Sequence, residues 1–155
     1  MVIVKNLQRK IKLDSAKLEH QARFFLELVK YAHFDLSIVL VNNSTMQSYN
    51  RLYRNKNTPT DILSFPMHPN AQPTKRIKAT DQAEKNLGDI IMSPEYILAD
   101  IGLWNQPLEE RIIRLLVHGI CHLLGYDHET NDEHKKMHRK EQWMFKRSLQ
   151  KGFRT

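Results

Sequence analysis

Residues 118–128 read HGICHLLGYDH, and this stretch determines the local fold and chemistry of the C-terminal half of the chain. Residues four apart lie on one face of a helix, so the imidazoles of His118 and His122 can converge on one ion. Gly125 lets the backbone leave the helix through a left-handed conformation, which brings His128 back toward that face. Three neutral imidazoles suit zinc and leave one coordination position open for catalysis. The stretch therefore predicts a helix, a glycine turn and a metal site.

Other side chains near this stretch support weaker predictions. Cys121, three residues after His118, is expected to be a small buried hydrophobic residue. Asp127 either orients a ligand imidazole or caps the following turn. His134 and His138 repeat the four-residue spacing, but lysines and an arginine surround them and would repel a cation. That second pair is therefore expected on a solvated helix face.

Hydrophobic spacing and cap residues divide the rest of the chain into interspersed strands and helices. Short β-branched segments predict strands at 2–6, 35–41, 61–66 and 88–93. Helices are predicted from Asp14 or Ser15 to about Ala32, from 42–44 to about Arg54, from Ser93 to Gly102, from Pro107 to Gly125, and from the capping box of Thr130 and Glu133 to about Lys151. The class is thus α+β, with a small mixed sheet of about four strands packed with about five helices. Residues 67–86 are polar and partly basic and are expected to form an exposed loop.

Length and composition limit the class of protein. The 155 residues suit one domain spanning 1–155, and the single cysteine excludes a disulfide framework. The apolar fraction of 41% and the charged fraction of 26% are those of folded globular chains. The sequence shows neither a signal peptide nor a membrane span, so a cytoplasmic location is expected. The net charge of +7 favours a polyanionic partner such as nucleic acid about as strongly as it favours solubility alone.

Gly119 separates the histidine motif from the zinc peptidases that share its spacing. In metzincin peptidases a glutamate follows the first histidine and activates the attacking water. Gly119 has no side chain, so peptide hydrolysis would need a base from elsewhere. Phosphodiester cleavage needs that base less, because an ion can polarise a phosphoryl oxygen while an arginine neutralises developing charge.

Three cations precede the strand predicted at 61–66 and are candidates for binding a phosphate. They are Arg51, Arg54 and Lys56. An arginine presents a planar fork that binds a phosphate through two hydrogen bonds, which a lysine cannot do. On composition alone, however, each of the three is expected to be a solvated surface charge.

Three ordered blocks of the sequence resemble a known family. HGICHLLGYDH resembles the H-G-x-x-H-L-x-G-Y-D-H signature of the YbeY-type bacterial endoribonucleases, and TDILSFP and LGDIIMS resemble two further blocks in the same order. The resemblance spans roughly residues 35–145. It implies a single-domain enzyme in which His118, His122 and His128 hold one zinc-like ion. It also implies cleavage of single-stranded RNA in the maturation and quality control of ribosomal RNA, notably at the 3′ end of the small-subunit RNA.

The resemblance assigns a role to Arg54 as well. In that family an arginine shortly before the T-[DN]-x-L-S-F-P block is functionally essential, and Arg54 in YRNKNTPTDILSFP occupies the matching place. Arg54 is thus expected to clamp a phosphate and to act in catalysis with the three histidines, with Arg51 and Lys56 as neighbouring RNA contacts. Residues 67–86 match no block of the family and inherit no role.

The implied partners and cofactor follow from the same resemblance. The partners are single-stranded RNA, ribosomal RNA and ribosomal subunits, with neither DNA nor a membrane expected. The cofactor is one Zn²⁺ per chain, which other divalent transition metals could replace in vitro because three imidazoles accept them as well.

Two other functions stay open on the sequence alone. One is a non-catalytic, ribosome-associated RNA-binding factor whose zinc braces the C-terminal helices. The other is a metal-dependent hydrolase of another bond, including peptides, which would need a base such as Asp127 or Glu129. The nucleophile is open too, because water would leave simple phosphate ends, whereas the adjacent 2′-hydroxyl would leave a cyclic phosphate.

Overall fold

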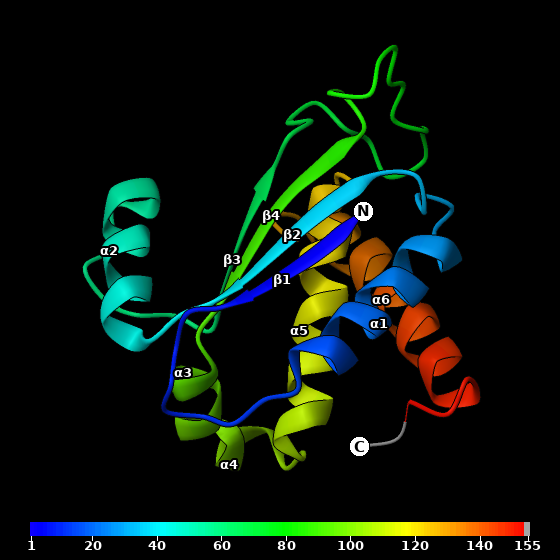
Figure 1. Ribbon diagram of the computed structural model, residues 1–155. Helices are drawn as coiled ribbons and strands as arrows, with labels where there is room; N and C mark the ends of the chain where they lie inside the picture. Colours follow the sequence, from blue (N-terminus) through cyan, green and yellow to red (C-terminus); the bar gives the residue numbers. More distant parts are fainter. Residues whose placement is uncertain (154–155) are drawn as a thin grey trace.

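The computed structural model describes residues 1–153, in which four strands and six helices are interspersed (Figure 1). The strands are β1 (Val2–Asn6), β2 (Asp35–Leu40), β3 (Ile62–Pro66) and β4 (Asn86–Met92). The helices are α1 (Ser15–Leu28), α2 (Asn43–Arg54), α3 (Pro94–Ala99), α4 (Ile101–Trp104), α5 (Leu108–Leu123) and α6 (Asn131–Gln150). The predicted α+β class and four-stranded sheet are confirmed, with one helix more than expected.

The four strands form one mixed sheet in the order β1-β2-β4-β3. β1, β2 and β4 run parallel, and β3 runs antiparallel to β4 at one edge. In this register Ile38 of β2 lies opposite Ile90 of β4, and Ile90 lies opposite Ser64 of β3. Because side chains alternate along a strand, Ile62 and Ser64 share a face of the sheet with Ile90.

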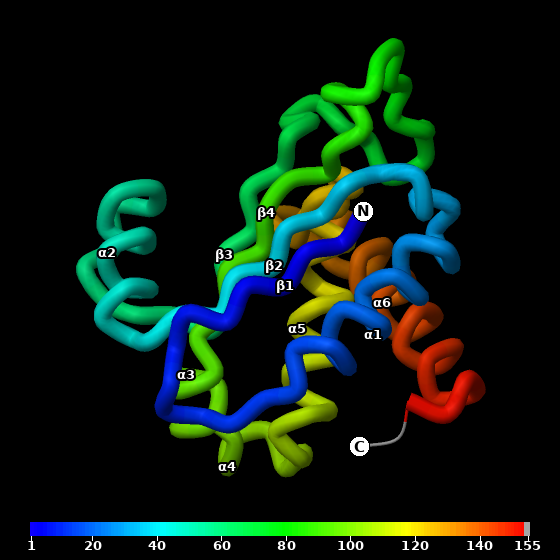
Figure 2. Tube along the Cα trace, in the orientation of Figure 1, coloured from blue at the N-terminus to red at the C-terminus, as the bar shows by residue number. Residues whose placement is uncertain are grey.

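Helices cover the two faces of the sheet unequally (Figures 1 and 2). α1, α5 and α6 lie on one face, where α1 contacts β1 and α5 contacts β3 and β4. This face carries the main hydrophobic core, to which α5 contributes eight buried residues. α2 stands alone on the opposite face, over a small cluster formed by Val41, Met46, Leu63 and Ile91. The histidine motif is therefore carried by a firmly packed helix, and Arg54 by an outlying one.

The first helix ends earlier than its sequence predicts. The expected end is near Ala32, but α1 ends at Leu28. Lys30 adopts a left-handed φ of 67°, and the N–H of Tyr31 donates to the carbonyl of Leu26. This is a Schellman-type helix end, for which glycine is the usual residue. The turn returns the buried Tyr31 to the core, so packing outweighs the cost of lysine in this conformation.

Gly102 does not end a helix, and that prediction was wrong. The helix that begins at Pro94 is interrupted at Asp100, whose φ of −91° and ψ of 0° leave the helical region. α4 then continues through Gly102 to Trp104, where Asn105 supplies a left-handed end with a φ of 48°. The one predicted helix is therefore two short helices, which accounts for the sixth.

The predicted glycine turn after α5 and the predicted capping box at the start of α6 are confirmed. Gly125 has a φ of 89° just beyond α5, and Thr130 and Glu133 form both hydrogen bonds of the capping box that begins α6. The connection from β3 to β4 is largely exposed, as expected of residues 67–86, except that Asn86 already belongs to β4. Within residues 1–153, no helix combines the length and the apolar character that crossing a membrane requires.

Candidate metal centre

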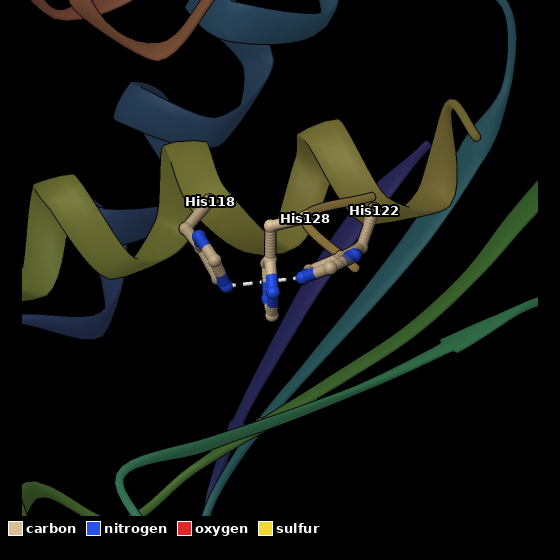
Figure 3. Close-up of side chains that lie close together, drawn as sticks. All are labelled: His118, His122 and His128. Atoms are coloured by element: carbon tan, nitrogen blue, oxygen red, sulfur yellow. Dashed lines mark hydrogen bonds between the residues drawn. The ribbon is translucent and has the colours of Figure 1, made fainter. Parts of the chain in front are cut away.

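The three predicted histidines converge beside α5 and the turn that follows it (Figure 3). His118 and His122 project from adjacent turns of α5, with their Nε2 atoms 3.0 Å apart. Gly125 turns the chain so that the ring of His128 returns to them, with its centroid 5.7 Å from that of His118 and 5.1 Å from that of His122. One nitrogen of each ring lies within 4.8 Å of the other two. The helix, the glycine turn and the convergence all follow the sequence prediction.

Hydrogen bonds at the Nδ1 atoms of two of the rings fix the orientation of these rings. Nδ1 of His118 lies 2.7 Å from a carboxylate oxygen of Glu141 on α6, and Nδ1 of His122 lies 3.0 Å from the carbonyl oxygen of Tyr126. Both partners are acceptors, so in the neutral rings each Nδ1 carries the proton and each Nε2 presents a lone pair. The metal ligands of known sites are oriented by such hydrogen bonds.

The donor set fits a divalent ion. Two nitrogen lone pairs 3.0 Å apart repel each other unless they share a cation. Two nitrogens on a tetrahedral zinc lie about 3.4 Å apart, so a small opening of the pair formed by His118 and His122 accommodates the ion. Three imidazoles leave a fourth position for water or substrate, as in catalytic zinc sites.

The surroundings of His122 keep this ring neutral. The pKa of His122 is lowered to about 4, mainly by burial and also by the nearby rings of His118 and His128, while Asp127 and the Tyr126 carbonyl partly oppose the shift. At neutral pH the ring is therefore unprotonated, which metal ligation requires.

Asp127 holds the turn rather than a ligand ring. Its Oδ1 accepts a hydrogen bond of 2.8 Å from the backbone N–H of His128. Of the two roles that the sequence left open for Asp127, the structure therefore shows the local cap. The ring-orienting carboxylate is Glu141 instead.

Glu141 is the residue that the histidine motif does not reveal. It lies in the polar helix α6, whose buried residues include Met137, Met144 and Phe145. Position 141 follows Met137 by one helical turn and precedes Phe145 by another, so it lies on the face that packs against the core. Helical spacing within α6 could therefore have predicted that Glu141 faces α5, although it could not have predicted which histidine Glu141 contacts.

A groove of about 750 Å³, here called the main groove, connects the three histidines with the end of α2. Arg54 and Lys56 both line it, so the structure brings these two predicted cations to the site. A terminal nitrogen of Arg54 donates to the carbonyl oxygen of Ser64 on β3 over 3.2 Å, which holds the side chain against that strand. Arg51 is exposed one turn earlier on α2 and does not line the main groove.

Gly119 faces the sheet. A Cβ at this position would lie 2.9 Å from Cδ1 of Ile90, 3.1 Å from Cδ1 of Ile62 and 3.2 Å from Oγ of Ser64. The helix approaches β3 and β4 closely here because residue 119 has no side chain. The lack of the peptidase glutamate therefore meets a packing requirement of this fold as well as altering the chemistry.

The remaining predictions near the motif hold. Cys121 is fully buried, with its Sγ 3.8 Å from the sulfur of Met144, and burial raises its pKa to about 12. Such a thiol is an inert packing residue. His134 and His138 are exposed on α6 and their rings stack with centroids 6.2 Å apart, as expected of a solvated helix face.

Comparison with known proteins agrees with this arrangement. The solution structure of a Thermotoga maritima protein has the same fold, with a TM-score of 0.59 and 21% sequence identity over 98% of this chain and 94% of that chain. The human endoribonuclease YbeY is 35% identical over 140 residues, which cover 90% of this chain and 83% of the human protein.

Bacterial relatives are similar to the chain over comparable lengths. The endoribonuclease YbeY of Aquifex aeolicus is 36% identical over 89% of this chain and 84% of its own length. That of Pelotomaculum thermopropionicum is 35% identical over 91% and 92%, respectively. The family model described as endoribonuclease YbeY matches residues 3–148. The chain therefore belongs to the endoribonuclease YbeY family.

Proposed function

We propose that this protein is a metal-dependent endoribonuclease that cuts single-stranded RNA at the site of His118, His122 and His128, with Arg54 as the phosphate clamp. Membership of an endoribonuclease family supports RNA as the substrate. The observation that carries the proposal is that three convergent imidazoles and the guanidinium of Arg54 line one groove. We assign one Zn²⁺ per chain to the histidines, because three neutral imidazoles and one open position suit that ion.

The residues of the main groove have separate tasks. Arg54 has five N–H donors, of which one terminal nitrogen is engaged by Ser64, and the rest of the fork is free to bind a phosphate. Lys56 adds positive charge to the same groove, and the exposed Arg51 adds positive charge on α2 outside the groove. His118, His122 and His128 would hold the divalent ion, which would supply Lewis-acid polarisation of a phosphoryl oxygen. Arg54 stabilises the negative charge that develops on the phosphate in the transition state.

Two nucleophiles are compatible with this site. Attack by water forms one P–O bond as a ribose oxygen leaves, and the products carry a simple phosphate and a hydroxyl. Attack by the adjacent 2′-hydroxyl leaves a 2′,3′-cyclic phosphate and a 5′-hydroxyl. In either case Asp127 or Glu129, which line the main groove, can accept the proton of the nucleophile. Analysis of the product ends separates the two routes, and a 2′-deoxy nucleotide at the cleavage site blocks only the second.

Ribosomal RNA is the substrate that we propose in the cell, notably the 3′ end of the small-subunit RNA, with ribosomal subunits as partners in the cytoplasm. The net charge of +7 supports a polyanionic partner. The three sequence blocks that resemble the family support this particular substrate. An unpaired strand suits the main groove, because its backbone can follow a positively charged channel without a duplex being opened.

Cleavage of a labelled single-stranded RNA tests the proposal. Wild type, His122→Ala and Arg54→Ala are purified identically, assayed for metal and checked for folding by circular dichroism. We expect the wild type to cut, and folded Arg54→Ala to keep about one metal ion per chain but to lose activity by at least about a hundredfold. Arg54→Lys recovers only part of the activity, since lysine lacks the bidentate fork.

Arg23→Ala is the matched control for these variants. Arg23 is an exposed arginine on α1 that pairs with Glu19, far along the chain from the histidines, and its loss removes the same charge. This variant should cut like the wild type. If Arg54→Ala and His122→Ala also cut like the wild type, the activity comes from a contaminating ribonuclease and the proposal is wrong.

A non-catalytic RNA-binding factor with a structural zinc is the second candidate. The hydrogen bond between His118 and Glu141 favours it, because this contact joins α5 to α6 and an ion there would brace both helices. This candidate predicts that removal of the metal lowers the Tm while metal-loaded wild type cuts no RNA.

A further inference from the structure

A second hollow, of about 510 Å³, opens on two of the three histidines, His118 and His128. His118, His128 and Asp61 line both this hollow and the main groove. From these shared residues the hollow extends along the N-terminal half of α5 to Arg111 and Trp104, whereas the main groove extends beyond the C-terminal end of that helix. The hollow is called the Trp104 pocket below.

Two arginines of the Trp104 pocket are already neutralised. The guanidinium of Arg111 lies 3.6 Å from the centroid of the Trp104 ring and 3.5 Å from the carboxylate of Asp61, and its side chain is only 13% exposed. Arg114 is held in the same way, 3.7 Å from the centroid of an aromatic ring of α6 and 2.8 Å from Glu110. Because each positive charge has an acidic partner, this pocket is not built to bind a free phosphate, unlike the main groove with Arg54.

The pocket is instead lined by a flat, partly exposed ring and by a glutamine whose buried side-chain oxygen has no hydrogen-bond partner. Arg111 lies over one face of Trp104, yet the residue is still 47% exposed. Gln106 lines the same pocket, and its Oε1 is the one buried side-chain oxygen or nitrogen without a hydrogen-bond partner in the described part of the chain. A buried acceptor without a partner is unfavourable. Because this Oε1 has almost no exposed surface, the Gln106 side chain has to turn toward the pocket before a ligand can donate to it. A nucleobase offers both a ring that stacks and N–H groups that donate.

We propose that the Trp104 pocket binds the base of a nucleotide next to the scissile phosphate, in an RNA strand that passes over the three histidines. This inference rests on the proposed function, because it takes the phosphate to lie in the main groove beside Arg54. The volume of about 510 Å³ suits one nucleoside. Stacking is tolerant of sequence because every base has a π-face, so the pocket holds the strand in position without selecting one base.

The fluorescence of Trp104 tests the pocket directly, because the chain has only two tryptophans. In zinc-loaded Trp143→Phe protein, Trp104 is the sole indole, and we expect adenosine monophosphate to quench its emission saturably while inorganic phosphate does not. Trp104→Phe protein is the control. Its remaining indole, Trp143, lies 4.3 Å from the Lys140 ammonium and outside the pocket, so its emission should not respond. The reporting protein keeps the pocket intact, so this result does not depend on the folding of a pocket variant.

Cleavage kinetics provide a second test. Trp104→Leu is expected to raise the KM for single-stranded RNA at least about fivefold, the lower range for loss of a stacking aromatic residue, with metal content and fold unchanged. Trp143→Leu makes the same change at a tryptophan of similar exposure, 39%, and should keep the wild-type KM. The comparison separates loss of the pocket from loss of an exposed indole in general.

The outcomes distinguish this inference from the proposed function. No quenching of Trp104 by adenosine monophosphate overturns the base site, and so does a wild-type KM for folded Trp104→Leu in a protein that cuts RNA. Quenching in a protein that cuts no RNA leaves the base site standing and removes the proposed function. Cleavage that needs Arg54 but does not change when Trp104 is replaced supports the proposed function and overturns the base site.

Discussion

The carboxylate of Glu141 lies 2.7 Å from Nδ1 of His118, so α6 sets the orientation of a ring that α5 carries. Removal of such a partner from a metal ligand costs about 10- to 100-fold in metal affinity. We therefore expect Glu141→Ala to weaken zinc binding by that factor in a chelator competition, with Glu141→Gln losing less because its amide oxygen still accepts. Asp132→Asn, on the exposed first turn of α6, should bind zinc like the wild type. Equal affinities for all four proteins would contradict the role given to Glu141.

Gly119 is the position at which a peptidase carries its glutamate, and the structure predicts what a side chain there does. Overpacking against Ile90 and Ser64 is expected to cost about 1–3 kcal/mol. Because both neighbours are buried and have little room to move aside, we expect the upper part of this range, which outweighs the gain in helix propensity of about 1 kcal/mol for Gly119→Ala. Urea unfolding should therefore show that Gly119→Ala is less stable than the wild type. Gly102→Ala is the control, because a Cβ there meets nothing within 4 Å, and it should be more stable by about 0.5–1 kcal/mol.

Gly119→Glu is expected to be still less stable and to show no cleavage of unfolded casein. The added carboxylate begins against the sheet, where Ile62 and Ile90 leave it no room. Peptide cleavage by the purified, metal-loaded variant would show that the glycine alone keeps this fold from acting as a peptidase.

Gly125 and Gly152 have almost the same backbone conformation, with φ of 89° and 88°, but different surroundings. A Cβ on Gly125 would lie 2.2 Å from the carbonyl oxygen of Ala71, whereas a Cβ on Gly152 would meet nothing within 4 Å. Gly152→Ala is therefore expected to lower the free energy of unfolding by only about 1–2 kcal/mol, the cost of a left-handed conformation. Gly125→Ala is expected to lower it by at least about 3 kcal/mol, because the added Cβ also clashes with Ala71. Chemical denaturation of the two variants measures the difference. Similar losses would mean that the loop of Ala71 moves aside freely.

His122 makes the metal-free protein sensitive to acid. Its folded pKa of about 4 lies below the ordinary value of 6.5, so the unfolded chain binds this proton more readily between those two values. The stability that the neutral His122 contributes is therefore fully present above pH 6.5. The free energy of unfolding falls as the pH drops from 6.5 toward 4. Allowing for solvent screening, the loss between pH 6.5 and pH 4 is roughly 2 kcal/mol, of which about 1 kcal/mol falls between pH 7 and pH 5. Urea midpoints of chelator-treated protein at pH 7 and pH 5 measure it, and His122→Gln should show a smaller drop between the two.

Local signals explain which parts of the fold could be predicted from the sequence. The helix of His118 and His122, the turn at Gly125 and the capping box of Thr130 all depend on residues close together in the chain, and all three were found. Lys30 ends α1 in a left-handed conformation that the sequence rules assign to glycine first, so packing rather than propensity decides that end. Asn105 ends α4 in the same way, and asparagine is the residue that most often replaces glycine there.

Contacts between distant elements could not be predicted in this way. Arg54 lines the same groove as the histidines only because β3 pairs with β4 at the sheet edge and α5 packs beneath both strands. Its role was indicated by family resemblance and not by spacing. Glu141 and Trp104 also approach the site through packing between helices, and no local pattern in the chain marks either of them as its neighbour.

The separation between the metal ligands and Arg54 along the chain has a consequence for the cell that makes this protein. All three ligands lie within residues 118–128, whereas Arg54 precedes β3 and the long loop. A chain still emerging from the ribosome has the arginine without the histidines, and a fragment of the C-terminal half has the histidines without the arginine. On the proposed function, in which cleavage needs both parts of the site, neither incomplete chain acts on the abundant RNA around it. Only the finished tertiary structure brings both parts together, so the proposed activity begins only when folding is complete.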